Sequence, residues 1–303
     1  MPWRGNQRSQ VGVAYATVAY LWWGLFPLYF HALAGVPAIE ILSHRIIWSV
    51  ILLVLLISAR RSWPEVLRSL RAPRALRTLA VSAVFISLNW VIFIWAVTEG
   101  HTLEASLGYF VNPLVTVAFG VVILRDRLTR LQMLAIALAT AGVVSLVIRA
   151  GRVPWVALAL ATTFATYGLI RKRLGIDAVA GLLGEVCLLA PLALAYVAWI
   201  QGTGTGHFGA GFKFTLLLAL SGIVTALPLL WFAKAVERLR LSTVGLLQYL
   251  NPSLQFAIAV FAFGERFTSA HALAFGLIWI SLAIYTSEAL ALARRTPVNA
   301  EPG

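Results

Sequence analysis

The sequence predicts an all-α integral membrane protein with ten transmembrane helices, arranged as two inverted five-helix repeats. Three observations predict this fold. The 303 residues are 60% hydrophobic and only 12% charged, whereas soluble domains carry about 25% charged residues. Apolar runs of about 20 residues, the length needed to cross ~30 Å of hydrocarbon, recur along the chain. The third observation is an internal repeat.

Two landmarks define the repeat. Asn112-Pro113 recurs 139 residues later as Asn251-Pro252. At the same offset, Asp-Arg-Leu-Thr at 126–129 recurs as Glu-Arg-Phe-Thr at 265–268. Each copy holds about five apolar runs, so the second copy must enter the bilayer from the opposite side. Inverted repeats of this kind surround a site near the midplane in secondary transporters. We therefore expect a first repeat at 11–148 and a second at 154–291.

Ten apolar runs are expected to cross the membrane. The first follows Arg4 and Arg8 and imitates a signal peptide. It exceeds the ~7–15-residue apolar core of such peptides, and we expect it to be retained. The sixth is short, and we expect Arg171 to extend it toward the interface. In chain order the expected spans are 11–34, 39–58, 78–98, 102–124, 131–148, 155–170, 178–200, 214–235, 242–263 and 270–291.

The basic residues are distributed unevenly between the loops. A net charge of +13 in a soluble protein would suggest a nucleic-acid partner. With the N-terminus in the cytoplasm, however, 18 lysines and arginines fall on the inner side and 4 on the outer side. This distribution follows the positive-inside rule. We expect both termini in the cytoplasm, contact with membrane lipid and no nucleic-acid partner.

The connecting segments carry no recognisable ligand motif. The connector 59–77 holds six arginines and is expected to be a solvated cytoplasmic loop that contacts anionic lipid. The segment 201–213 is rich in glycine but lacks the preceding strand and the Lys-Ser/Thr pair of a phosphate-binding loop. We interpret it as a flexible external link.

Cofactor, metal and covalent chemistry are not expected. Cys187 is the single cysteine, which excludes an internal disulfide and a cysteine-based metal site. The five histidines lack the spacing of zinc ligands. Hydrolase and Walker motifs are absent from the sequence. We therefore expect no cofactor, no metal and no catalytic residue.

Polar residues beside two intramembrane prolines form matched stripes on the fourth and ninth spans. Pro113 and Pro252 are expected to free the carbonyls of Tyr109 and Gln248, because proline lacks an N–H and crowds the carbonyl four residues earlier. Polar groups in a membrane are costly unless they are paired or face an aqueous cavity. The alternatives are helix–helix hydrogen bonds or a shared substrate cavity. The stripes are Tyr109, Asn112 and Thr116, and Gln248, Asn251 and Gln255.

Aromatic residues gather on the first and third spans. Trp22, Phe26 and Tyr29 fall on one helical face, and Asn89 and Trp90 lie on the third span. Such a wall suits planar, amphipathic or cationic solutes. Lipid contact and ordinary packing are the alternative interpretation. We include Asn89 and Trp90 among the candidate cavity residues.

Ionisable residues inside the spans are candidates for coupling and gating. Glu40 and His44 share a helical face beside Arg45, and they could form a gate at the outer rim that titrates near neutral pH. The alternative is a local ion pair that neutralises Arg45. Glu185 lies well inside the seventh span and is a candidate proton acceptor, with Lys234 as a candidate partner. Static pairing is the alternative for Glu185.

Four long segments resemble the RarD group of EamA-type carriers in the drug/metabolite transporter superfamily. The resemblance covers nearly the whole chain. It implies ten helices, two EamA repeats, a bacterial inner-membrane location, and export or exchange of small metabolites or drugs, driven by protons or by solute exchange. Arg125 stands where the superfamily often has glycine, whereas Gly264 keeps it. The segments are 40–49, 89–97, 104–113 and 239–252.

Two other classes of function compete with a transporter that works by alternating access. A membrane-embedded enzyme acting on a lipid or lipid-linked substrate would use Glu40, His44 and Glu185 at one depth. A channel would need a continuous polar path, for which the first, fifth and tenth spans hold too few polar residues. We expect a small-molecule substrate, with the proton as candidate coupling ion. The sequence specifies neither the solute nor the oligomeric state.

Overall fold

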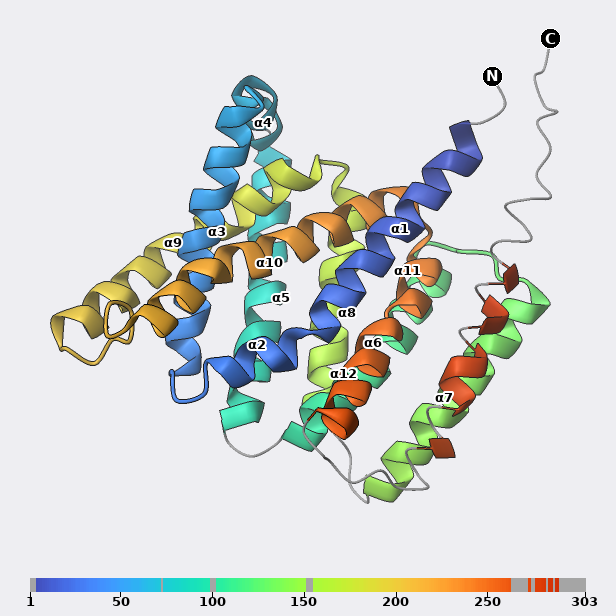
Figure 1. The fold of residues 1–303 in the computed structure, drawn as a ribbon. Coiled ribbons are helices and arrows are strands. Elements are labelled where there is room, and N and C mark those ends of the chain that lie inside the picture. The colour runs from blue at the N-terminus through green and yellow to red at the C-terminus, as the bar shows by residue number, and fades with distance from the viewer. Residues whose placement is uncertain are drawn as a thin grey trace, which may run out of the picture.

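The regular secondary structure in the described part of the chain is all helical (Figure 1). Five helical stretches are long and apolar enough to cross a membrane, namely Ser9–Ala32, Ala38–Ala59, Ala75–Phe93, Ala178–Gly202 and Phe212–Arg238. Shorter apolar helices cover Gly108–Val122 and Arg130–Ser145. The computed structural model describes residues 4–71, 73–98, 102–150, 155–262, 272–273, 276–281, 283–285 and 287–288.

The first half of the chain departs from the expected spans at two places. The first expected span is broken at Leu25, because Pro27 lies in the first turn of the second helical piece and has no N–H to donate. The arginine-rich connector is not a plain loop, since it contains a short helix (α4). The helices are α1 (Arg4–Gly24), α2 (Phe26–Ala32), α3 (Ala38–Ala59), α4 (Trp63–Arg71), α5 (Pro73–Thr98), α6 (Thr102–Val122) and α7 (Arg130–Ala150).

The second half contains one further break, in the expected ninth span. The helices are α8 (Trp155–Leu174), α9 (Ala178–Gly202), α10 (Phe212–Arg238), α11 (Leu241–Leu247) and α12 (Leu250–Phe261). Pro252 falls in the first turn of α12, where a missing N–H is tolerated. In contrast, Pro113 lies inside a continuous helix, α6. The expected tenth span, 270–291, lies partly outside the described residues and is helical where it is described.

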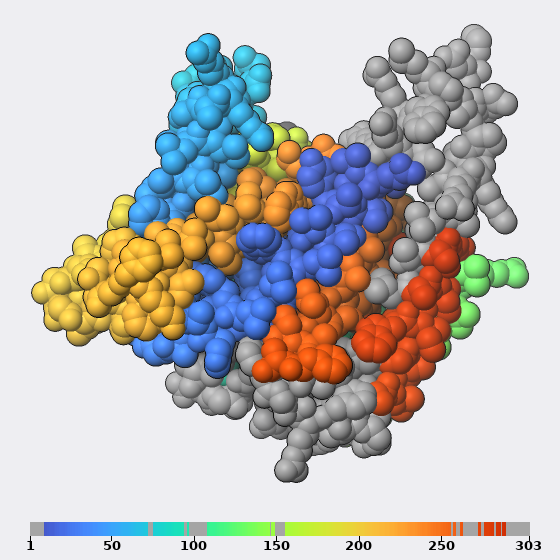
Figure 2. Space-filling view, in the orientation of Figure 1, coloured from blue at the N-terminus to red at the C-terminus, as the bar shows by residue number. Residues whose placement is uncertain are grey.

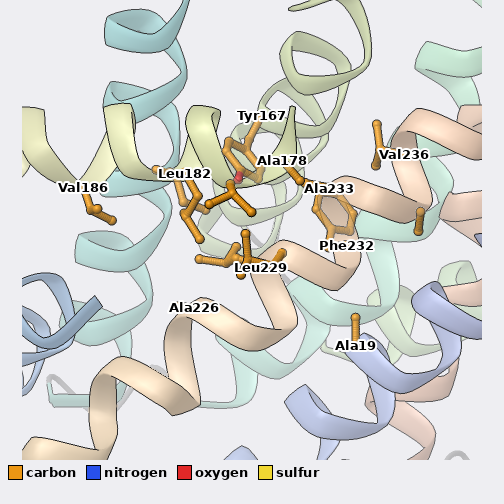
Figure 3. Packing of buried hydrophobic residues seen from close by; sticks show 14 of the residues in the cluster. Ala19, Tyr167, Ala178, Leu182, Val186, Ala226, Leu229, Phe232, Ala233 and Val236 are labelled. Carbon is orange, nitrogen blue, oxygen red and sulfur yellow. The ribbon is translucent and has the colours of Figure 1, made fainter. Parts of the chain in front are cut away.

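The two halves interlock rather than sit side by side. In the first half, α1 packs on α10 and α12, and α3 packs on α9 and α10. In the second half, α8 packs on α5 and α6, while α11 packs on α6. Figure 3 shows the interior of this arrangement, where Ala19 of α1 lies near Phe232 and Ala233 of α10, and Tyr167 of α8 faces α9.

Polarity is distributed as lipid requires. Large apolar side chains face outward along the helices, including Leu55, Val122, Leu192 and Phe212. A soluble monomer rarely exposes contiguous apolar surface on this scale. Polar side chains are turned inward, where neighbouring helices can pair them. The fully buried ones include Ser49, Ser82, Ser221, Thr225 and Ser242.

Two parts of the molecule project from the bundle. In the space-filling view, α4 stands out at one end, and the joined ends of α9 and α10 stand out at the side (Figure 2). The loop between α9 and α10 is more structured than the flexible link expected from its glycines. The side chain of Gln201 donates to the Phe208 carbonyl at 3.0 Å, and the loop folds back onto α3.

Candidate functional site

A cavity lies between the two halves of the chain. Its lining comes from α1, α2, α3, α5, α6, α8, α10 and the broken ninth span. The empty space inside it and at its mouth is about 840 Å³, with open solvent included. Seven of the eight candidate cavity residues line it: Asn89, Trp90, Tyr109, Asn112, Gln248, Asn251 and Gln255.

The eighth candidate, Thr116, is buried behind the lining. Its hydroxyl lies 3.4 Å from Oδ1 of Asn112 and donates to it. In the second half, the Gln255 amide donates to Oδ1 of Asn251 at 2.9 Å and to the carbonyl of Trp23 at 3.3 Å. In each half, therefore, the asparagine side chain accepts a hydrogen bond from the side chain four residues further along the same helix. Thr116 thus contacts a cavity residue, Asn112, without lining the cavity itself.

The two polar stripes adjoin because α11 approaches α6 closely. A Cβ atom on Gly245 would lie 2.9 Å from the Pro113 carbonyl oxygen, so only glycine permits this approach. The expected freeing of the Gln248 carbonyl is wrong, since it accepts from the backbone N–H of Asn251 at 3.0 Å. Among the described residues, Oε1 of Gln248 is buried without a hydrogen-bond partner.

Aromatic rings form the remaining wall. Trp23, Phe26, Phe30, Phe93 and Phe164 line the cavity with the polar residues. Their rings contact one another in tilted and edge-to-face arrangements, as with Trp23 and Phe164 at 5.7 Å between centroids, which aromatic pairs favour. The wall is held in place by packing between helices from both halves.

Asn89 lines the cavity, but its amide group is already engaged. Nδ2 donates to the Leu160 carbonyl at 2.8 Å and to the Thr163 hydroxyl at 3.0 Å. Asn89 therefore ties α5 to α8.

Arg45 lies in the cavity and not in a rim gate. Its Nε donates to Oγ1 of Thr225 at 2.8 Å. Its guanidinium carbon lies 5.0 Å from the ring centroid of Trp90 and 5.8 Å from that of Phe26. The expected local ion pair with Glu40 is wrong, because Glu40 has a different partner.

Glu40 pairs with His207 of the glycine-rich loop. The backbone N–H of His207 donates to Oε1 of Glu40 at 2.6 Å, and the His207 Nδ1 atom lies 2.8 Å from Oε2. His44 instead stacks on Phe208 at 5.0 Å, and neither of its ring nitrogens has a hydrogen-bond partner among the described residues. The expected gate of Glu40 with His44 is therefore a contact of Glu40 with His207.

Glu185 occupies a polar cluster outside the cavity lining. Its Oε1 accepts from Ser82 at 2.6 Å and lies 3.6 Å from Nη1 of Arg171. Tyr167 donates to Oε2 at 3.4 Å. Lys234, the expected partner, is not part of this cluster, because its Nζ lies over the ring of Tyr15. The expected pairing of Glu185 with Lys234 is wrong, because side chains of α5 and α8 supply the partners of Glu185.

Arg171 also departs from the sequence expectation. It was expected to reach the interface, but its side chain is only 3% exposed and turns inward toward α9. A Cβ atom on Gly181 would overlap the guanidinium group, so the glycine makes room for it. Arg171 and His207 were both missed as partners, because no local spacing in the sequence links them to Glu185 and Glu40.

Metal ligation is not supported. Within the described ranges, no group of three or more His, Cys, Asp or Glu side chains is placed to hold a metal ion. The cavity offers amide groups, aromatic faces and one guanidinium, which can bind and orient an organic solute but supply no obvious acid–base pair.

The fold and cavity define a class: a multi-pass helical membrane protein with a polar and aromatic cavity between interlocked halves. The model of the EamA-like transporter family matches residues 10–148. The chain belongs to this family. The family consists of transporters and not enzymes, so the membrane-enzyme alternative is not supported.

Several bacterial relatives match almost end to end. The chain is 45% identical to an uncharacterized transporter of Vibrio cholerae, over 94% of this chain and 95% of the relative. It is 44% identical to Protein RarD of Escherichia coli K12, over 96% and 98% of the two chains. Chloramphenicol-sensitive protein RarD of Pseudomonas aeruginosa is 33% identical, over 95% and 97%. The resemblance to the RarD group is confirmed.

A solved crystal structure shares the fold. The superposition has a TM-score of 0.71 and covers 95% of this chain and 100% of that chain, at 21% sequence identity. At this identity the likeness concerns the helical architecture alone.

Proposed function

We propose that the protein is a secondary active transporter of the bacterial inner membrane that moves small planar or amphipathic solutes by alternating access. The observation that carries this proposal is the cavity, where Asn112 and Asn251 from corresponding positions of the repeat line one space. A midplane site between inverted halves is the arrangement that secondary transporters use. Export or exchange is the direction that we propose.

The pattern of helix contacts supports two inverted repeats of five spans, 11–148 and 154–291. If the repeats are related by a two-fold axis, each contact should recur with the halves exchanged. The α1–α10 contact has its counterpart in α8–α5, and the α6–α8 contact in α1–α12. The α3–α10 contact recurs as α9–α5. The family model, which spans residues 10–148, supports the same first repeat.

The charges support an orientation with both termini in the cytoplasm. The described arginines of α4, of the α6–α7 connection and of the α10–α11 connection would then face the cytoplasm. Cysteine scanning in a Cys187→Ser background tests this orientation together with the inverted repeat. Single cysteines in 125–130 should be labelled from inside and those in 264–269 from outside; labelling of both from one side would contradict the proposal.

Flux into reconstituted vesicles tests the cavity. Saturable uptake of a solute should fall about ten-fold or more in Asn112→Ala and Asn251→Ala, because each substitution removes a cavity amide worth ~1.4 kcal/mol or more in an apolar setting. The matched control is Thr140→Ala, on an exposed face of α7, which should transport normally. Unchanged flux in both asparagine variants, with folded protein, would remove the cavity assignment.

Glu185 is the proposed coupling group, acting by proton acceptance or by pairing. Its ion pair with Arg171 and its hydrogen bonds with Ser82 and Tyr167 support the second role, a pairing outside the cavity that changes during transport. Proton-driven uptake measured with an imposed pH gradient distinguishes the two roles. A Glu185→Gln variant that keeps solute exchange but loses the response to the gradient supports proton coupling. Loss of both processes in protein that is still folded supports pairing.

A further inference from the structure

Arg45 is the one charged side chain among the described residues that line the cavity. It rises from α3 and is only 6% exposed. The other lining groups are amides, aromatic rings and small or aliphatic residues. A buried cation at the wall of a solute cavity determines which charge of solute can enter favourably.

The guanidinium is surrounded by rings rather than by acids. Its carbon lies 5.0, 5.8 and 5.9 Å from the ring centroids of Trp90, Phe26 and Phe30. Across the part of the chain that the structure describes, no carboxylate lies within ion-pair distance of Arg45. The nearest acid in sequence, Glu40, is engaged with His207.

Few described groups accept a hydrogen bond from Arg45. A guanidinium carries five N–H donors, and within the described residues Arg45 makes one hydrogen bond, from Nε to Thr225. Aromatic faces stabilise the positive charge but do not replace an acceptor for the terminal nitrogens. The planar fork of a guanidinium matches the two oxygens of a carboxylate.

The same geometry disfavours a cationic solute. Two like charges repel strongly where the local dielectric is low, and among the described lining residues there is no acid to offset an added positive charge. The rings of Trp90, Phe93 and Phe164 offer flat apolar surface beside the guanidinium. A ligand that uses both features has an anionic oxygen pair at one end and a planar ring at the other.

We propose that the cavity selects planar aromatic monocarboxylates, with the carboxylate on the guanidinium of Arg45 and the ring against the aromatic wall. This inference rests on the proposed function, because it names the solute class of the same cavity. It chooses among the planar, amphipathic and cationic solutes that an aromatic wall alone would accept. The carboxylate supplies the counter-charge that the described lining lacks.

Three compounds with one ring system test the proposal. Indole-3-acetate, indole-3-acetamide and tryptamine carry a negative, neutral and positive end on the same indole. Equilibrium binding of each is measured with purified protein in nanodiscs, for the wild type, Arg45→Gln, Arg45→Lys and the control Lys234→Gln. Lys234 lies over Tyr15 and outside the cavity lining, so the control removes a charge without touching the site.

The wild type should bind the acid at least about ten-fold more tightly than the amide, as expected for a charge-assisted hydrogen-bonded pair, and tryptamine least tightly. Arg45→Gln should abolish the preference for the acid. Arg45→Lys should retain only part of it, because an ammonium cannot form the bidentate pair. Lys234→Gln should keep the wild-type order. If Arg45→Gln does not fold, the Arg45→Lys ratio decides.

The proposal is overturned if the wild type binds the amide or the amine as tightly as the acid, if none of the three binds, or if the preference survives both Arg45 substitutions. Flux of the same compounds into vesicles separates this failure from failure of the transport function. Flux of the amine or amide, but not of the acid, supports the transport function and contradicts the carboxylate assignment. Binding of the acid without flux of any compound supports the carboxylate site and contradicts the transport function.

Discussion

Asn112 and Asn251 occupy corresponding positions of the repeat and line the same cavity, and each accepts a hydrogen bond from the side chain four residues further along. The donor is Thr116 in the first half and Gln255 in the second. The same kind of hydrogen bond thus orients both cavity amides, although one helix is continuous at this position and the other is broken. α6 runs through its proline, while the ninth span is broken before Asn251.

Thr116→Val should lower transport without removing any atom from the cavity. The substitution keeps the side-chain shape and deletes the donor that holds Asn112. We expect flux to fall about 3–10-fold, corresponding to ~0.6–1.4 kcal/mol for a polar side-chain contact in a membrane. Initial rates in vesicles give the measurement. Thr140→Val, on the exposed face of α7, is the control, and equal rates in both variants would contradict a positioning role.

Glu185→Gln should destabilise the protein strongly. The substitution leaves Arg171 buried without its counter-charge, a change that costs about 3–5 kcal/mol for a buried pair. The expected readout is a clear drop in Tm in detergent. The double variant Arg171→Met with Glu185→Met should recover much of the loss, because it removes both charges. A double variant no more stable than Glu185→Gln would contradict the pairing.

Gly222→Ala should weaken the contact between α10 and α3. A Cβ atom at this position would overlap the backbone of Trp48, so the helices would have to separate. Overpacking of this kind costs about 1–3 kcal/mol, and the Tm should fall accordingly. Gly202→Ala is the matched control, because nothing lies within 4 Å of its added Cβ. A smaller loss at Gly222 than at Gly202 would be inconsistent with this packing.

Asp126→Ala should loosen the start of α11. The carboxylate accepts from the backbone N–H of Ser242 at 3.1 Å and from its hydroxyl at 2.8 Å. Hydrogen bonds to a charged acceptor contribute about 1.5–3 kcal/mol, so the Tm should fall and amide exchange in 241–247 should accelerate. Exchange in α9 serves as the internal reference. Unchanged protection of 241–247 would show that Asp126 does not cap α11.

The turn after α6 explains a local departure in sequence. The superfamily pattern often has glycine where this chain has Arg125, and Arg125 has a φ of 57°, in the left-handed region that glycine adopts most readily. Arg61, after α3, has a similar φ of 52°.

The cavity could be anticipated from sequence to a large extent. The repeat offset and the helical spacing placed Tyr109, Asn112, Gln248, Asn251 and Gln255 on matched faces, because helical periodicity is a local property. The breaks at Leu25 and before Asn251 could not be located, since a proline may kink a helix, end it or start the next piece depending on its neighbours.

The partners of the charged residues could not be anticipated. Arg45 bonds Thr225 across a separation of 180 residues, and Ser82 bonds Glu185 across 103. Sequence spacing predicts only neighbours on one helix, which is why Glu40, His44 and Arg45 were grouped. Glu40 and His44 in fact both face the loop between α9 and α10, at His207 and Phe208, whereas Arg45 bonds Thr225 of α10.

By itself, the sequence determined a multi-pass helical membrane protein with a repeated polar motif, because composition, apolar run length and helical period are read along the chain. Only the tertiary structure decided which charges meet and which stay unpaired at the cavity. Such pairing depends on the approach of helices distant in sequence, and in a membrane that approach is set by close packing between particular side chains.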